Sequence, residues 1–367
     1  PGSSRVDVGE VHFLDAAFGW APVSQDCGDH TCVVVYVSDD GGGSWLPRTD
    51  RPVAVGDGTN GWVAAVPAVR LATKDIGWLI DVEGNLYSTT NGARTWRPER
   101  TEGAVVALEA HGESVWRLEQ SCPESDARCR YAWLTSNDYG GDWRPAQPPP
   151  PMGPSGVSST GVSLVRPSAR VAYVLSDSGD YPAAGHPGDP RPEEWKPDPL
   201  LARTEDGGRT WTEMRPPCPA IGKGGSWGAD LAASTPEDLW LVCHDDAYSG
   251  AMQPKHLYRS TDGAESWSED LGTPNAGSGG KTAAASPTRA CRGGSRTGIA
   301  CTRDGGRSWF FPIGGAENPR DGGVHVAQFV DDRHGWAIAQ DNDSGNHNVL
   351  WRTTDGGESW SPTRIAS

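Results

Sequence analysis

Short runs of alternating apolar and polar residues recur along the whole chain, and each is interrupted by a polar turn and resumed at an aromatic residue. The clearest copies are residues 11–21, 69–79 and 326–337. Weaker copies are residues 105–116, 162–173 and 229–240, and the poorest lies around residues 282–291. Alternation with a period of two is typical of half-buried β-strands. Each run therefore predicts two short strands joined by a turn.

An octapeptide with the pattern Ser/Thr-x-Asp-x-Gly-x-Ser/Thr-Trp follows each run. Its seven copies are residues 38–45, 89–96, 136–143, 204–211, 260–267, 302–309 and 353–360. Three copies are degenerate, with Asn91 and Ala93 in the second, Asp142 in the third and Ala264 in the fifth. The Asp side chain suits capping of a tight turn, and Gly supplies the positive φ that a hairpin turn requires. We expect structural roles for Asp40, Asn91, Asp138, Asp206, Asp262, Asp304 and Asp355, and for Trp45, Trp96, Trp143, Trp211, Trp267, Trp309 and Trp360.

Together, one alternating run and one octapeptide hairpin form a unit of four strands that occurs seven times. Successive octapeptide tryptophans are 51, 47, 68, 56, 42 and 51 residues apart, close to the length of a propeller blade. The expected fold is all-β, a single seven-bladed β-propeller of four-stranded antiparallel blades that closes on itself and so removes exposed sheet edges. The expected blades are approximately residues 10–55, 56–103, 104–150, 157–217, 226–273, 281–315 and 323–366. The N-terminal segment 1–9 looks partly like a cloning remnant, and residues 4–9 are a candidate extra strand of the last blade.

The octapeptides resemble Asp boxes, the bacterial neuraminidase (BNR) repeats. With the Gly-Trp element upstream, the pattern is similar to the seven-bladed propellers of the photosystem II assembly factor family, of sortilin and of the xyloglucanases. This resemblance covers residues 10 to 364 and implies that the box residues are structural. Sialidases carry an Arg-Ile-Pro motif that this chain lacks, and xyloglucanases use two propellers where this chain has one. The basic partner-binding patch of the assembly factors has no counterpart in so acidic a chain.

The formal net charge of −16 argues against nucleic acid and anionic membranes as partners. The chain has no apolar run of 18 residues, so no transmembrane segment is expected. We expect a monomer.

Eight cysteines form four local pairs in the sequence. The pairs are Cys27 with Cys32, Cys122 with Cys129, Cys218 with Cys243, and Cys291 with Cys301. An even number of cysteines at short separations is typical of disulfides and hence of an extracellular or cell-envelope protein. Metal binding is the alternative, but zinc sites favour Cys-x-x-Cys pairs, which the chain lacks.

Nearly all long insertions are expected on one face of the propeller, opposite the octapeptides, where loops of a rigid scaffold usually carry function. Within them, aromatic and polar residues that suit a sugar or peptide are Tyr181, His186, Trp195, Trp227 and Tyr248. His244, Asp245 and Asp246 are candidates for ligand binding, for metal binding or for acid–base chemistry. Asp341 and Asp343 resemble part of a calcium loop, but the later bidentate Glu is missing. No other cofactor is expected.

The sequence favours an exported, non-catalytic scaffold that binds a protein or glycan on the loop-rich face. The alternative is a glycoside hydrolase or lyase, sialidase-like or xyloglucanase-like, that uses acidic residues in the central funnel. Two funnel carboxylates about 5–9.5 Å apart would favour the enzyme. A third interpretation is an accessory domain of a longer chain.

Overall fold

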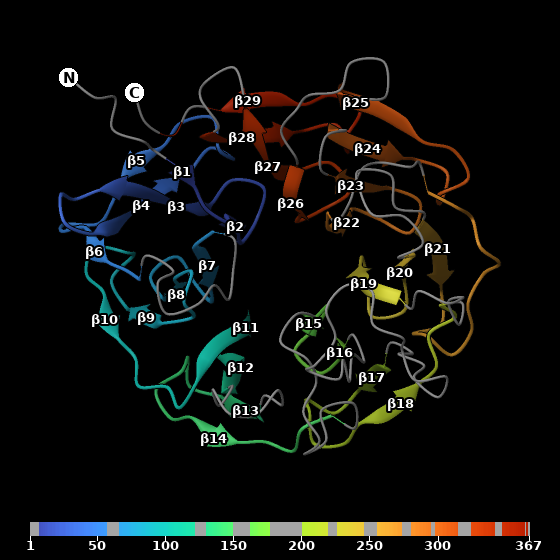
Figure 1. The fold of residues 1–367 in the computed structure, drawn as a ribbon, viewed down its shortest axis with the longest axis horizontal. Coiled ribbons are helices and arrows are strands. Elements are labelled where there is room, and N and C mark those ends of the chain that lie inside the picture. The colour runs from blue at the N-terminus through green and yellow to red at the C-terminus, as the bar shows by residue number, and fades with distance from the viewer. Residues whose placement is uncertain are drawn as a thin grey trace, which may run out of the picture.

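Seven antiparallel sheets surround one axis in the computed structural model, as Figure 1 shows. The structure describes residues 7–56, 66–121, 130–149, 162–176, 200–218, 226–245, 255–273, 280–294, 298–314, 324–341, 347–363 and 365. The predicted all-β, seven-bladed propeller is confirmed. No helix is present among these residues, and so none that could span a membrane.

Each blade is a sheet of strands that follow one another in the sequence, with the first strand nearest the axis, except in blade one, where β2 is nearest and both β1 and β2 pair with β3. The first blade contains β1 (Asp7–Val8), β2 (His12–Phe13), β3 (Gly19–Asp26), β4 (Thr31–Ser38), β5 (Leu46–Pro47) and β6 (Val53–Ala54). The second contains β7 (Ala68–Leu71), β8 (Gly77–Ile80), β9 (Leu86–Thr89) and β10 (Arg97–Pro98). The third contains β11 (Ala104–His111), β12 (Ser114–Ser121), β13 (Arg130–Ser136) and β14 (Arg144–Pro145). The fourth contains β15 (Val162–Val165), β16 (Ala172–Ser176), β17 (Leu200–Thr204) and β18 (Thr212–Met214).

The remaining three blades continue the ring. The fifth contains β19 (Ser226–Ala233), β20 (Leu239–Asp245) and β21 (Lys255–Ser260). The sixth contains β22 (Thr282–Ala284), β23 (Ala290–Gly294), β24 (Gly298–Thr302) and β25 (Phe310–Gly314). The seventh contains β26 (Val324–Phe329), β27 (Gly335–Asp341), β28 (His347–Thr353) and β29 (Ser361–Thr363).

The fifth blade differs from the prediction because its outer segment forms no strand among the described residues. Two backbone bonds still join that segment to β21, from the N–H groups of Ser268 and Leu271 to the carbonyls of Arg259 and Leu257 at 2.8 and 2.9 Å, while side chains of the segment accept from the N–H groups of β21. Asp270 Oδ1 accepts the N–H of Leu257 at 3.1 Å, and Ser268 Oγ accepts the N–H of Arg259 at 3.0 Å. These side-chain acceptors compete with the backbone ladder that a fourth strand would form.

All seven octapeptides form the same tight turn. The fourth and fifth residues of each copy have positive φ, including Ala93 (66°), Tyr139 (59°) and Ala264 (73°), as a type I′ turn requires. In the first copy, Asp40 Oδ1 accepts the N–H of Ser44 at 2.9 Å, as the sequence predicts. The N–H of the fourth residue donates to a carbonyl of the turn between strands one and two in every blade. Both kinds of turn therefore lie on one face of the ring, the octapeptide face.

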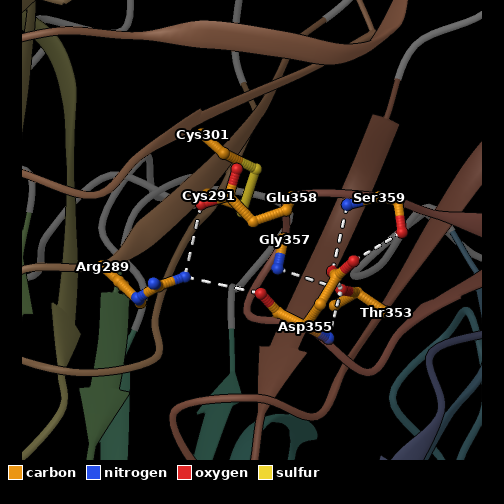
Figure 2. Close-up of a disulfide and its surroundings, with 8 residues drawn as sticks. All are labelled: Arg289, Cys291, Cys301, Thr353, Asp355, Gly357, Glu358 and Ser359. Atoms are coloured by element: carbon orange, nitrogen blue, oxygen red, sulfur yellow. Dashed lines mark hydrogen bonds and ion pairs between the residues drawn. A yellow bond between two sulfur atoms is a disulfide. The ribbon is translucent and has the colours of Figure 1, made fainter.

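An aromatic residue at the start of the second strand is packed between blades. Trp20, Trp78, Trp116, Tyr173, Trp240 and Trp336 occupy this position and are buried. Each lies against the fifth residue of the next blade's octapeptide, as Trp116 does against Gly208 and Trp240 against Gly306. The sixth blade has Cys291 at this position, bonded to Cys301 on the neighbouring strand, and Figure 2 shows the disulfide beside Gly357 of blade seven.

Side chains close the ring between blades seven and one. Gln328 Oε1 accepts the N–H of Phe13 at 3.0 Å, and Gln328 Nε2 donates to the carbonyl of Phe13 at 3.2 Å. The Trp336 ring stacks on Phe13 with centroids 3.5 Å apart. Of the segment 4–9, expected to add a strand to the last blade, the described part, β1, pairs with β3 of the first blade.

Candidate functional site

A cavity of 280 Å³ is bounded by the innermost strands of all seven blades. Its lining includes one equivalent residue from each blade, the one that pairs across the strands with the buried aromatic or, in blade six, with Cys291. We call these seven residues the axial ring: His12, Arg70, Glu109, Val165, Ala232, Ala283 and Gln328. The axial-ring residues lie near the end of the innermost strand, just before the turn between strands one and two. Because these turns lie on the octapeptide face, the cavity lies toward that face.

The axial ring is polar on one side and apolar on the other. Blades seven, one, two and three contribute Gln328, His12, Arg70 and Glu109. Blades four, five and six contribute Val165, Ala232 and Ala283. The backbone positions are equivalent, so the asymmetry comes from the side chains alone.

Charged groups of the cavity wall pair across neighbouring blades. Arg70 Nη2 lies 2.5 Å from Glu10 Oε1, and Arg70 Nε lies 3.4 Å from Glu109 Oε1. The side chains of Arg70, Glu10 and Glu109 are 16%, 17% and 28% exposed, so solvent screens these pairs only partly. Arg166 extends the series into blade four and donates to the carbonyl of Ser114 at 2.9 Å and its hydroxyl at 2.7 Å. These four charges therefore connect blades one to four and compensate one another, and Lys281 adds an exposed cation 4.0 Å from Glu10.

The two carboxyl groups on Arg70 have opposite pKa shifts. Burial raises the pKa of Glu109 and outweighs the opposing attraction of Arg70. Burial also acts on Glu10, but there Arg70 and then Lys281 outweigh it and lower the pKa to about 2. Glu10 is thus ionised throughout the physiological pH range, whereas Glu109 takes up a proton more readily than Glu10 does.

His12 supplies an uncharged ring to the same wall. Burial and then Arg70 lower the pKa of His12 to about 3, so the imidazole is neutral at physiological pH. Its Nδ1 lies 3.3 Å from the backbone N–H of Leu71, which donates to it. A neutral ring that accepts at Nδ1 carries its proton on Nε2, so the other nitrogen of His12 is a hydrogen-bond donor.

A second polar cluster lies between blades five and six. Arg292 is 0% exposed, and its Nη1 donates to Thr282 Oγ1 at 2.9 Å and lies 3.4 Å from Asp230 Oδ2. Its Nη2 donates to His244 Nε2 at 2.9 Å. Burial and then Arg292 lower the pKa of His244 well below its usual value, and the same causes lower that of Lys255 to about 7. The structure thus places His244 at a blade interface, bonded to a buried cation.

For the other predicted loop residues, the structure does not describe the side chains. Tyr181, His186, Trp195, Asp246, Tyr248 and Asp343 lie outside the described residues. Trp227, Asp245 and Asp341 lie on β19, β20 and β27, where only their backbone is described. Among the described residues, no group of three or more His, Cys, Asp or Glu is placed to hold a metal ion. The calcium and loop-face sites therefore stay predictions.

Three predicted disulfides are present: Cys27–Cys32, Cys218–Cys243 and Cys291–Cys301. The fourth, Cys122–Cys129, lies outside the described residues. Disulfides persist in oxidising compartments, so these bonds indicate such an environment.

Sequence reasoning missed Glu10, His12, Arg70, Glu109 and Arg166 as site residues. Each lies in or beside an inner strand in which apolar neighbours such as Val69 and Leu71 are buried. Aligning the seven Gly-Trp elements would have revealed His12, Arg70 and Glu109, because a polar side chain occupies the same register position in blades one, two, three and seven.

No protein-family model and no curated protein matches the chain. Among solved structures, "YCF48 bound to D1 peptide" has a TM-score of 0.60 and 16% identity, and the match covers 96% of this chain and 94% of that one. YCF48 from Cyanidioschyzon merolae has a TM-score of 0.60 and 12% identity, covering 97% and 98%. An ancestral GH74 enzyme has a TM-score of 0.60 and 13% identity, and this chain spans about half of it, 100% against 47%. The TM-scores of 0.60 establish a shared propeller fold, whereas identities this low leave function open.

Proposed function

We propose that the protein is an exported, non-catalytic binding scaffold that recognises a protein or glycan, and that its octapeptides are Asp boxes. The observation that carries the proposal is the compensated charge of the axial cavity. Arg70 binds both Glu10 and Glu109, and Arg166 is held by the backbone of blade three, so these side chains are already fixed before a ligand arrives. Preorganised walls reduce the entropy lost on binding.

Two further observations support a scaffold. A structural neighbour of similar length, YCF48, is described as bound to a peptide. The long loops that hold Tyr181, Trp195 and Tyr248 are predicted on the face opposite the octapeptides, where they would offer a contact surface separate from the axial cavity. The disulfides support export, and we propose that the protein acts as a monomer.

One observation favours a glycoside hydrolase as the second candidate. Carboxyl groups whose environments move their pKa values apart are the arrangement that acid and base catalysts use. Glu109 would serve as the acid and Glu10 as the carboxylate partner. The ion pairs of both groups with Arg70 make this candidate weaker, because a catalytic carboxyl needs access to the glycosidic oxygen.

One screen separates the two candidates. Purified protein is incubated with a glycan array, a panel of polysaccharides and an extract of its native cell envelope, and both retained ligand and released reducing sugar are measured. We expect retention without release. Release that disappears in Glu109→Gln, but persists in the exposed control Glu269→Gln, would establish the hydrolase instead. Absence of both retention and release would reject the scaffold as well.

A further inference from the structure

We propose that the axial ring is a binding site for one neutral sugar ring, an inference that rests on the scaffold function proposed above. A pyranose has a hydroxyl edge and a C–H face, and the axial ring has a polar and an apolar side to match them. The cavity of 280 Å³ is slightly smaller than ordinary ligand sites, which are about 300–1,000 Å³. It therefore suits a terminal sugar better than an internal stretch of polysaccharide.

The polar side offers one acceptor and one donor. Glu109 uses Oε1 for a long contact to Arg70 at 3.4 Å, and among the described residues Oε2 has no further hydrogen bond. His12 accepts at Nδ1 from Leu71, and within the same part of the chain its Nε2–H has no acceptor. A hydroxyl both donates and accepts, so vicinal hydroxyls of a sugar satisfy Glu109 and His12 together.

The apolar side offers a surface for the C–H face of the sugar. Leu231, Ala232 and Ala283 line it, with Phe329 at its border with blade seven. Small alanine side chains at two equivalent positions leave room where longer residues would fill the cavity.

The occupant is uncharged because the charges of the lining residues already balance. Glu10 and Glu109 carry two negative charges, and Arg70 and Arg166 carry two positive charges, while Lys281 lies outside the lining, is 61% exposed and pairs with Glu10 at 4.0 Å. A charged ligand would lose hydration in the cavity and gain no uncompensated partner there. Neutral hydroxyls lose less hydration free energy than charged groups do, and hydrogen bonds to Glu109 and His12 compensate for that loss.

The test uses methyl glycosides of neutral hexoses as probes, with methyl glucuronide and methyl glucosaminide as charged counterparts. Saturation-transfer NMR and titration calorimetry measure their binding to the whole protein. We expect neutral glycosides to bind at least about tenfold more tightly than either charged probe. Glu109→Gln should weaken binding about tenfold or more, because a hydrogen bond to a charged group is replaced by one to a neutral amide.

Two variants keep the outcome interpretable. Ala283→Leu fills the apolar side while leaving the charge pairs in place, and it should abolish glycoside binding. Glu269→Gln changes an exposed carboxylate away from the cavity and should bind as the parent protein does. Equal binding by Ala283→Leu, preference for a charged probe, or no glycoside binding at all would overturn the sugar site. Retention of a peptide partner in that last case would leave the scaffold function standing, whereas release of sugar from a polysaccharide would reject the scaffold itself.

Discussion

At the scale of single residues, Asp355 is one of two side-chain acceptors in the octapeptide turn of blade seven, beside Thr353 Oγ1, which accepts the N–H of Gly357 at 2.9 Å. Asp355 Oδ1 accepts from the N–H of Ser359 at 3.0 Å and from Thr353 Oγ1 at 2.7 Å, while Oδ2 accepts from Ser359 Oγ at 2.6 Å (Figure 2). The second turn preserves the first of these bonds with an amide, since Asn91 Oδ1 accepts the N–H of Thr95 at 3.1 Å. Acceptor geometry, rather than negative charge, is therefore what the turn requires.

Substitutions at Asp355 should separate geometry from charge. Asp355→Ala leaves three donors without their acceptor, and we expect a loss of about 1–3 kcal/mol in the free energy of unfolding. Asp355→Asn reproduces the arrangement at Asn91 and should cost less than half as much. Urea unfolding at neutral pH measures both. Equal losses for the two variants would show that charge, and not the acceptor, stabilises the turn.

The ion pair of Glu10 makes stability depend on pH. Its folded pKa of about 2 lies below the usual 4.5, so its contribution is complete above pH 4.5 and is lost as the pH falls toward 2. Glu10→Gln removes this contribution, and we expect it to cost about 2–3 kcal/mol at neutral pH. Denaturant unfolding at several pH values should show the difference from the parent protein shrinking below pH 4.5. A difference that stays constant with pH would contradict the assignment.

At the scale of elements, a disulfide replaces the aromatic residue that packs between blades. A Cβ atom built on Gly357 would lie only 2.5 Å from Cys291 Sγ and 3.0 Å from Cys301 Sγ, so the sulfur atoms fill the space between blades six and seven. In blade three, Trp116 fills the corresponding space against Gly208, opposite Thr135 on the neighbouring strand. The bond between Cys291 and Cys301 therefore secures a blade interface as well as a strand pair.

Loss of this disulfide should lower the free energy of unfolding, and an aromatic residue in its place should restore most of that stability. We expect Cys291→Ala with Cys301→Ala to lose about 2–5 kcal/mol, from the cross-link and from the cavity left behind. Cys291→Trp with Cys301→Thr copies blade three and should recover most of that loss. Cys27→Ser with Cys32→Ser is the control, because that bond joins Cys27, just after β3, to Cys32 on β4 of the same blade. Thermal unfolding gives the order, and an equal loss for both disulfides would refute the interface role.

The periodic parts of this fold could be predicted because they are local. A two-residue alternation and an octapeptide with its own hydrogen bonds specify a hairpin without knowledge of the rest of the chain. The axial cavity could not be predicted that way, because Arg70 and Glu109 are 39 residues apart and meet only after the blades converge. The missing outer strand of blade five has a similar cause, since Asp270 takes a backbone N–H for which no periodic signal exists. Tyr181 and its loop remain untested for a different reason, because they lie outside the described residues.

At the scale of the whole molecule, the ring is closed without strand exchange among the described residues, since blades one and seven are each built from consecutive strands. The closing contacts are made by side chains. Gln328 bonds both backbone groups of Phe13, Trp336 Nε1 donates to the carbonyl of Gly41 at 3.0 Å, and Arg352 Nη1 donates to that of Asp40 at 3.4 Å. Blade seven is thus held by a disulfide-filled interface on one side and by these side chains on the other.

This arrangement predicts where the ring opens first. Gln328→Met keeps the shape of the side chain but loses both bonds to Phe13, so exchange of backbone amides should rise in residues 7–13 and 324–329 before it rises elsewhere. Gln120→Met is the matched control, because Gln120 is buried and bonds Tyr131 within a single blade. Hydrogen–deuterium exchange read by mass spectrometry distinguishes the two variants. An increase confined to one blade in both would mean that Gln328 does not close the ring. An increase on both sides of the seam in Gln328→Met alone would show that one glutamine couples the two ends of a propeller that no shared strand joins.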